Sequence, residues 1–184
     1  MNTFIYGTGN TGKIQYMQEV FRPLALRLVG IGEYLPSLPE VDESGNNPGK
    51  NARIKALTYF QALRSFKGID YPLFSCDLGL YIEGLPEKEQ PGVHIRRVGN
   101  KILTEEEMVG YYSSLVQRLG GKVTARYRNA ICLVTSEGEL NEYMGEDIAS
   151  EKFLLVAKPH PKHISGFPLG RLSVQIATGR YYMI

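Results

Sequence analysis

A glycine-rich segment near the start of the chain, Gly7-Thr8-Gly9-Asn10-Thr11-Gly12-Lys13, constrains the fold more than any other feature of the sequence. It follows a short apolar run at residues 3–6 and precedes apolar residues at helical spacing, namely Ile14, Met17, Val20 and Phe21. This order predicts a strand, a tight loop and a helix. Glycines let the backbone approach a ligand closely, and a helix start offers free amide groups. We therefore expect the loop to bind an anion such as phosphate, with Lys13 adding a positive charge.

Two motifs of nucleotide-binding proteins and one structural alternative fit this loop. Gly7, Gly9 and Gly12 satisfy the G-x-G-x-x-G pattern of dinucleotide-binding units, and Glu33 lies about where such units carry their acidic ribose ligand. That interpretation predicts a small NAD-binding protein. The P-loop pattern is incomplete, because Ile14 occupies the position where a hydroxyl should bind magnesium. The structural alternative is a strand-to-helix turn that needs glycine for its backbone dihedral angles.

The rest of the chain predicts one mixed α/β domain over residues 1–184. Strand–helix alternation near the start and hairpin-like spacing near the end favour a mixed sheet over an all-parallel one. Further strands are expected at residues 24–31, 72–76, 79–82, 123–127, 130–135 and 140–144, and further helices at 51–63 and 104–119. The stretch from Pro36 to Gly49 is expected to be a long loop, and such loops often carry function.

The composition excludes several classes of protein. The chain has 184 residues, 43% of them hydrophobic, so it can bury a core, and its longest apolar runs are too short to span a membrane. The 21 Lys and Arg residues nearly balance the 19 Asp and Glu residues, so the charge of +2 predicts no nucleic-acid partner. Cys76 and Cys132 lie in apolar runs that suit reduced thiols, and the first residues show no secretion leader. We therefore expect a cytoplasmic protein.

Beyond the glycine loop, three blocks of residues follow the order and spacing of one known family. The first is Thr8-x-Asn10-x-x-Lys13. The second is the acidic stretch Pro39-Glu40-Val41-Asp42-Glu43-Ser44-Gly45 with Asn51-Ala52-Arg53-Ile54-Lys55-Ala56. The third is Phe74-Ser75-Cys76-Asp77-Leu78-Gly79-Leu80 with Pro91-Gly92-Val93 and Arg97. The chain thereby resembles the inosine triphosphate pyrophosphatases, enzymes that remove non-canonical purine nucleoside triphosphates.

The resemblance implies a fold, an activity and an assembly. The fold would be mixed α/β, with a long central sheet and helices forming two lobes around a nucleotide cleft. The enzyme would use Mg²⁺ to hydrolyse nucleoside triphosphates between the α and β phosphates, releasing monophosphate and pyrophosphate. The expected assembly is a homodimer. Because the three blocks are together more specific than the glycine loop alone, the triphosphate interpretation displaces the dinucleotide interpretation.

The resemblance also implies roles for particular residues. The triphosphate would be bound by residues of the first two blocks: Thr8, Gly9, Asn10, Lys13 and Lys55. Asp77 would be the general base that orients water, since a carboxylate can accept the water's proton. Asp77 and Glu43 would bind the metal. Arg97 and Phe167 would complete the substrate site, with Phe167 stacking on the base.

Two departures from the family's pattern affect the expected metal site. Lys50 stands where the family has a glutamate, and Cys76 replaces the first residue of an aspartate pair. In one outcome, Lys50 extends to solvent, and the oxygen ligands come from Asp42, Glu43, Asp77 or Glu83. In the other, Lys50 and Arg53 neutralise phosphate charge themselves. The protein would then be a catalytically impaired nucleotide-binding or regulatory protein.

A short histidine motif near the C-terminus is a weaker candidate. His160 and His163 are three residues apart, at a spacing seen in zinc sites. Pro161 disfavours a helix between them, and neither cysteine nor a carboxylate cluster is close in sequence. We therefore do not expect a zinc site.

Overall fold

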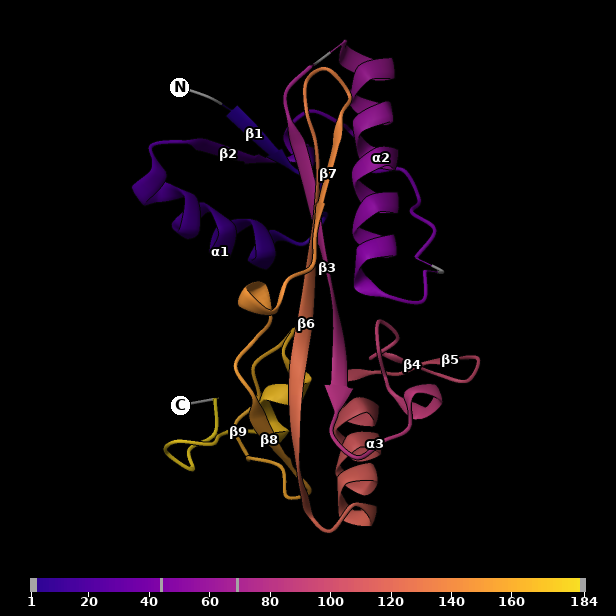
Figure 1. Ribbon diagram of the computed structural model, residues 1–184, viewed down its shortest axis with the longest axis vertical. Coiled ribbons are helices and arrows are strands. Elements are labelled where there is room, and N and C mark those ends of the chain that lie inside the picture. Colours follow the sequence, from indigo (N-terminus) through magenta and orange to yellow (C-terminus); the bar gives the residue numbers. More distant parts are fainter. Residues whose placement is uncertain (1–2, 44, 69, 183–184) are drawn as a thin grey trace. The chain divides into compact units, whose positions relative to one another are not determined.

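The computed structural model describes residues 3–43, 45–68 and 70–182 (Figure 1). Ser44, part of the acidic stretch, lies outside the described residues. The chain divides into two compact units. Unit 1 comprises Met1–Leu78 and Asn129–Ile148, and unit 2 comprises Gly79–Arg128 and Ala149–Ile184. Within the described residues, no helix is long and apolar enough to cross a membrane.

In the part of the chain that the structure describes, seven strands form a mixed sheet, so the mixed α/β fold is confirmed. The order β2-β1-β3-β6-β8-β9, with β7 on β6, uses β1 (Thr3–Tyr6), β2 (Arg27–Gly30), β3 (Leu73–Ile82), β6 (Lys122–Val134), β7 (Leu140–Tyr143), β8 (Phe153–Val156) and β9 (Ser173–Gln175). Strand β1 pairs in parallel with β2 and β3, whereas β7 and β8 pair antiparallel with β6. A separate hairpin joins β4 (Arg97–Val98) to β5 (Lys101–Ile102).

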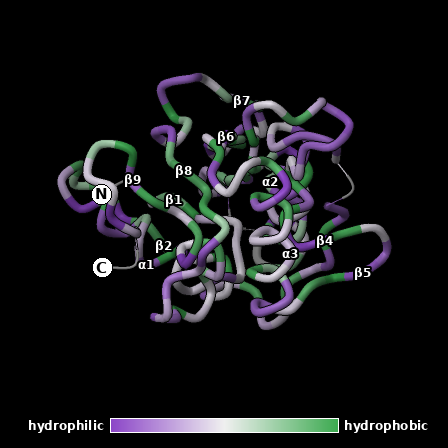
Figure 2. Tube along the Cα trace, turned by 90° about the horizontal axis from the view of Figure 1, so that it is seen from below, coloured by the Kyte–Doolittle hydropathy of each residue, from purple (hydrophilic) through white to green (hydrophobic). Residues whose placement is uncertain are grey.

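Unit 1 has one helix on each face of its sheet. Side chains alternate along a strand, so neighbouring residues face opposite ways. Ile5 and Leu73 join the core under α2 (Pro48–Lys67), whereas Tyr6 and Phe74 join the core under α1 (Thr11–Phe21). The hydropathy colouring of Figure 2 shows β1 and β2 as mostly hydrophobic, as strands covered on both faces should be.

The core of unit 2 forms around α3 (Glu105–Arg118). Met108, Tyr112 and Val116 of this helix pack with Leu155 of β8 and Leu172 of the short 3₁₀ helix Pro168–Leu172. The helix begins with a capping box, in which Thr104 accepts the amide of Glu107 and the Glu107 carboxylate accepts the amide of Thr104. This start agrees with the expected helix at 104–119.

Several element boundaries differ from those expected. The strands expected at 72–76 and 79–82 are one strand, β3, and those expected at 123–127 and 130–135 are one strand, β6. Strand β2 begins only at Arg27, because residues 22–24 form a 3₁₀ helix. Helix α2 is longer than expected, since Asn47 caps it and Pro48 opens its first turn. Strands β4, β5, β8 and β9 were not expected.

Candidate functional site

The glycine loop connects β1 to α1 as expected. Asn10 is the N-cap of α1, and its Oδ1 accepts the backbone N–H of Lys13 at 3.0 Å. Thr8 Oγ1 accepts the backbone N–H of Asn10 at 3.2 Å. Gly9, Asn10 and Lys13 are exposed. The loop therefore presents polar groups and a lysine at a helix start, where an anion is favoured.

Gly7 is required for close packing and not for an unusual backbone angle. None of Gly7, Gly9 and Gly12 has a positive φ, so the structural alternative based on glycine dihedral angles is wrong. A Cβ atom on Gly7 would lie 2.3 Å from Ser75 Oγ and 2.8 Å from Tyr59 Cδ2. The Gly7 amide donates to the Phe74 carbonyl at 2.8 Å, and Ser75 Oγ donates to the Gly7 carbonyl at 2.9 Å. These contacts hold the start of the loop beside β3, three residues before Asp77.

Asp77 takes part in a three-residue ionic cluster in unit 1. Lys55 Nζ of α2 lies 2.8 Å from Asp77 Oδ1 and 2.7 Å from Glu43 Oε1. The side chains of Lys55 and Asp77 are each 13% exposed, whereas that of Glu43 is 56% exposed. We call Lys55, Asp77 and Glu43 the Lys55 cluster. It brings together three residues expected to act on a triphosphate or a metal.

Lys55 remains a cation despite its burial. Burial alone would lower the pKa of Lys55, but hydrogen bonds and Coulombic attraction from Asp77 and Glu43 outweigh it and raise that pKa. Two carboxylates and one ammonium leave the cluster with one excess negative charge. An excess of this sign can attract a divalent cation.

Cys76 faces the opposite side of the sheet from Asp77 and packs with the core under α1. Burial raises the pKa of its thiol to about 11, although a hydrogen bond with Tyr6 and the charges of Lys13 and Lys55 act against this shift. At neutral pH the residue is therefore a thiol, which is a poor nucleophile and a poor metal ligand.

The Lys55 cluster fits Mg²⁺ only as part of a shared ligand set. Asp77 and Glu43 converge on one ammonium nitrogen, and Mg²⁺ is usually held by one or two carboxylates together with substrate phosphates. The described residues contain no group of three or more His, Cys, Asp or Glu side chains that could hold a metal. The donor set is thus compatible with a metal that arrives with a triphosphate.

The remaining charged candidates are placed elsewhere. Lys50 is exposed and lies five residues before Lys55, which is roughly 140° around the helix. This placement agrees with the outcome in which Lys50 extends to solvent. Arg53 pairs with Glu142 of β7 at 2.8 Å. Of the other possible oxygen ligands, Asp42 is exposed, and Glu83 belongs to unit 2, where it pairs with Lys152 at 2.7 Å.

Two expected substrate-binding residues belong to unit 2. Arg97 is exposed in the β4–β5 hairpin. Phe167 is 66% exposed and directly precedes the 3₁₀ helix Pro168–Leu172. An exposed phenylalanine has an unused apolar face that can stack on a ligand ring.

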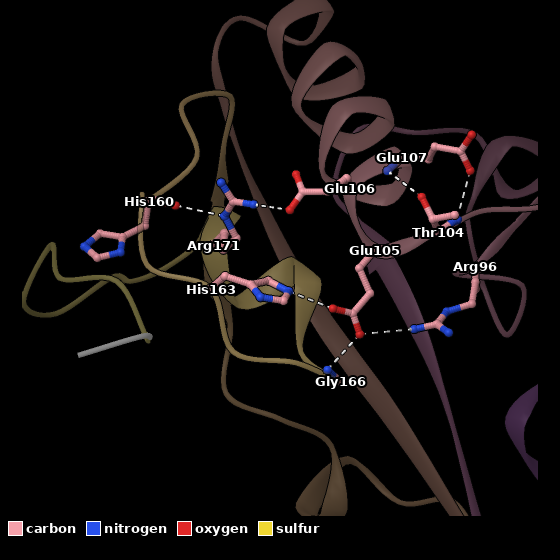
Figure 3. Close-up of polar contacts among 9 residues, drawn as sticks. All are labelled: Arg96, Thr104, Glu105, Glu106, Glu107, His160, His163, Gly166 and Arg171. Atoms are coloured by element: carbon pink, nitrogen blue, oxygen red, sulfur yellow. Dashed lines mark hydrogen bonds and ion pairs between the residues drawn. The ribbon is translucent and has the colours of Figure 1, made fainter.

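The two histidines of the C-terminal motif do not form a site together. His160 packs against the ring of Tyr181, whereas His163 Nε2 lies 2.7 Å from Glu105 Oε2 (Figure 3).

Sequence reasoning missed Ser75 and Glu105. Ser75 is fully buried, and its hydroxyl fixes the glycine loop. A polar residue within an otherwise apolar strand could have indicated this role. Glu105 lies in the first turn of the helix expected at 104–119, but no local pattern connects it with residues some 60 positions later.

Comparison with known proteins identifies relatives of this chain. The Ham1 family matches residues 4–149. A dITP/XTP pyrophosphatase of Deinococcus deserti is 31% identical over 144 residues, 77% of this chain and 62% of that protein. A dITP/XTP pyrophosphatase of Synechocystis sp. is 33% identical over 135 residues, 73% of this chain and 60% of that protein. The chain thus spans less than two thirds of the length of these relatives.

Solved structures share the fold. A HAM1 protein from Coxiella burnetii matches with a TM-score of 0.76 and 22% identity, over 100% of this chain and 86% of that one. The Staphylococcus aureus Ham1 protein matches with a TM-score of 0.71 and 18% identity, over 99% of this chain and 85% of that one. At these identities the likeness concerns the fold alone.

Proposed function

The chain belongs to the Ham1 family, as its sequence motifs suggested, and from this premise we propose that it hydrolyses non-canonical purine nucleoside triphosphates to monophosphate and pyrophosphate. The observation that carries this proposal is the Lys55 cluster, in which a buried ammonium joins two carboxylates near the glycine loop. The names of the curated relatives, dITP/XTP pyrophosphatase, point to the same substrate class.

The reaction needs a nucleophile, a proton acceptor and compensation of phosphate charge. Asp77 orients a water molecule and accepts its proton as the water oxygen attacks the phosphorus of the α phosphate. The bond between this phosphorus and the oxygen bridging the α and β phosphates breaks, and pyrophosphate leaves. Thr8, Gly9 and Asn10 bind phosphate oxygens through the glycine loop, and Lys13 and Lys55 offset their charge.

Mg²⁺ is part of the proposal. Asp77 and Glu43 would hold it together with oxygens of the triphosphate, and when bound it would offset phosphate charge. Arg97 and Phe167 are further candidates for contact with the substrate.

The test is pyrophosphate release from ITP, dITP, XTP and the ordinary triphosphates, with and without Mg²⁺. We expect release from the non-canonical purines that needs the metal and falls by about 10²-fold or more in Asp77→Asn. Asp70→Asn is a matched control, because it removes the same charge from an exposed ion pair with Arg64. Metal-independent release, or release unaffected by Asp77→Asn, would contradict the proposal.

A second candidate function is nucleotide binding without efficient hydrolysis. It is favoured by Cys76, a protonated thiol where the family has a carboxylate. Under this alternative, triphosphates raise the melting temperature of the protein without being hydrolysed, because a ligand that binds only the folded state stabilises it. Cys76→Asp and Lys50→Glu would then be the first reversions to test for restored turnover.

Three further features complete the proposal. The two units would act as one pyrophosphatase domain over residues 1–184. The protein would be a homodimer, which sedimentation can test, with no nucleic-acid or membrane partner. A cytoplasmic location is supported by the free thiols Cys76 and Cys132, which suit a reducing compartment.

A further inference from the structure

The segment between β8 and the 3₁₀ helix Pro168–Leu172 is anchored in two places within unit 2. Its base is held by Arg171, whose Nε donates to the His160 carbonyl at 2.9 Å and whose Nη1 lies 2.8 Å from Glu106 Oε1. The His160 amide donates to the Arg171 carbonyl at 2.7 Å. The segment ends in a turn at residues 163–167, where the Phe167 amide donates to the Ile164 carbonyl at 3.1 Å.

Glu105, the first residue of α3, holds this turn. Its Oε1 accepts the backbone N–H of Gly166 at 2.7 Å, and its Oε2 lies 2.7 Å from His163 Nε2 (Figure 3). Arg96 Nη2 approaches Oε1 at 4.0 Å. We call Glu105, His163, Gly166 and Arg96 the Glu105 cluster. Each carboxylate oxygen therefore serves one donor of the turn, and Arg96 adds a positive charge.

The contact with Gly166 acts directly on Phe167. Gly166 has a φ of +86°, a conformation that side-chain-bearing residues rarely adopt, so it sets a sharp change of chain direction just before Phe167. Fixing the Gly166 amide fixes the peptide that leads into this conformation. Phe167 then presents its exposed ring from a defined position, although its own side chain is 66% exposed.

We propose that Glu105 is a positioning residue that fixes Phe167 for contact with the purine base. The inference rests on the proposed function, because it assigns the turn at 163–167 to recognition of that substrate's base. Glu105 does not touch the substrate. It reduces the conformational freedom that Phe167 would otherwise lose on binding, and this lowers the cost of binding the base. The pKa of Glu105 lies below its ordinary value, first because of the Gly166 hydrogen bond and then because of His163, in agreement with a carboxylate that retains both contacts.

The first test measures the turn without a nucleotide. The chain has no tryptophan, so Phe167→Trp introduces a single fluorophore at the position of interest. In this background, Glu105→Ala should lower the steady-state anisotropy of Trp fluorescence, because the turn loses both contacts. Glu105→Gln keeps an acceptor for the Gly166 amide and should restore part of the anisotropy. Glu151→Ala removes the same charge from an exposed residue of unit 2 that belongs to neither anchor of the segment, and it should leave the anisotropy unchanged.

The second test separates base binding from phosphate binding. ITP carries a base, whereas inorganic tripolyphosphate has only the phosphates. Glu105→Ala should raise the KM for ITP by about tenfold, as expected for losing hydrogen bonds to a charged group, while kcat changes by less than about twofold. The affinity for tripolyphosphate, measured by calorimetry, should stay as in the wild type. Glu105→Gln should give an intermediate KM.

The outcomes distinguish this inference from the proposed function. Unchanged anisotropy in Glu105→Ala overturns the role of Glu105 in holding the turn. Lower anisotropy with an unchanged KM for ITP, or equal weakening of ITP and tripolyphosphate, overturns its role in base recognition. A wild-type chain that binds neither ligand overturns the proposed function, and the assignment of the turn to a purine base fails with it.

Discussion

The Lys55 cluster of unit 1 and the Glu105 cluster of unit 2 use similar groups in opposite proportions. In the first, one cation is shared by two carboxylates, and Lys55 and Asp77 are each 13% exposed. In the second, one carboxylate is shared by several donors, and its partners His163 and Arg96 are 45% and 52% exposed. Burial strengthens electrostatic interactions, whereas water screens them at exposed positions.

This difference indicates that the Lys55 cluster is suited to catalysis and that the Glu105 cluster is suited to holding a turn in place. A buried ammonium with two carboxylates leaves an excess of negative charge in a place of reduced screening, and this can bind a cation and activate water. A carboxylate that already accepts hydrogen bonds from the turn has little capacity left for chemistry, but these hydrogen bonds hold backbone and side chains in place. The proposed hydrolysis therefore belongs to unit 1, and the proposed presentation of Phe167 belongs to unit 2.

The largest effect is expected from breaking the Lys55 cluster with Lys55→Met, which removes the ammonium group and keeps an unbranched apolar side chain that is one atom shorter. Asp77 and Glu43 would face each other without a cation between them. We expect a loss of about 2–3 kcal/mol in the free energy of unfolding, less than for a fully buried pair because Glu43 is exposed. Urea unfolding measures this loss, and a variant as stable as the wild type would show that the cluster contributes no net stability.

A smaller effect is expected from adding one carbon atom to the glycine loop. Gly7→Ala places a Cβ 2.3 Å from Ser75 Oγ and should destabilise the protein by about 2 kcal/mol through overpacking. Gly110 in α3 of unit 2 is the matched control, because no atom lies within 4 Å of its added Cβ. Gly110→Ala should stabilise the protein by about 0.5–1 kcal/mol through helix propensity. Equal effects of the two substitutions on the urea midpoint would contradict the close packing at Gly7.

Only the features that carry a local sequence signal could be predicted from the residues alone. The strand, loop and helix over residues 3–21 and the capped start of α3 follow from local signals, namely glycine spacing, apolar periodicity and capping residues. No local pattern links Glu43, Lys55 and Asp77. Their expected roles came from the family resemblance, which aligned three separate blocks of residues.

Contacts between distant segments set the limit of sequence prediction. Strand β3 pairs with β1 and β6, and β6 also pairs with β7 and β8. These pairings with distant segments override the apparent breaks at Asp77 and at residues 128–129. Likewise, Glu105 meets His163 across 58 positions, and neither residue carries a signal for the other.

The two cysteine thiols, which both belong to unit 1, should make the stability of the protein depend on alkaline pH. Burial raises the pKa of Cys76 and of Cys132 to about 11 from the ordinary value of 9.0. The unfolded chain ionises these thiols first, so their contribution is fully present below pH 9 and is lost between pH 9 and 11. Stability should fall by about 1 kcal/mol per thiol by pH 10. Urea unfolding at pH 8 and pH 10 tests this, and the loss should shrink in the double variant Cys76→Ala/Cys132→Ala. An equally steep loss in that variant would contradict the assignment.

The smallest effect is expected at an exposed ion pair of unit 2. Lys152 and Glu83 lie 2.7 Å apart, but their side chains are 56% and 54% exposed. Because solvent screens such pairs, Lys152→Met should leave the urea midpoint unchanged within error. The substitution matches Lys55→Met in chemistry, so a similar loss of stability in both variants would show that burial does not distinguish the two sites.

The most direct test of this division of roles is a single kinetic comparison of Asp77→Asn and Glu105→Ala with ITP as substrate. We predict that Asp77→Asn lowers kcat by about 10²-fold or more with little change in ITP affinity, and that Glu105→Ala raises KM with kcat nearly unchanged. Loss of kcat in Glu105→Ala, or full kcat in Asp77→Asn, would contradict the assignment of chemistry to unit 1 and base recognition to unit 2.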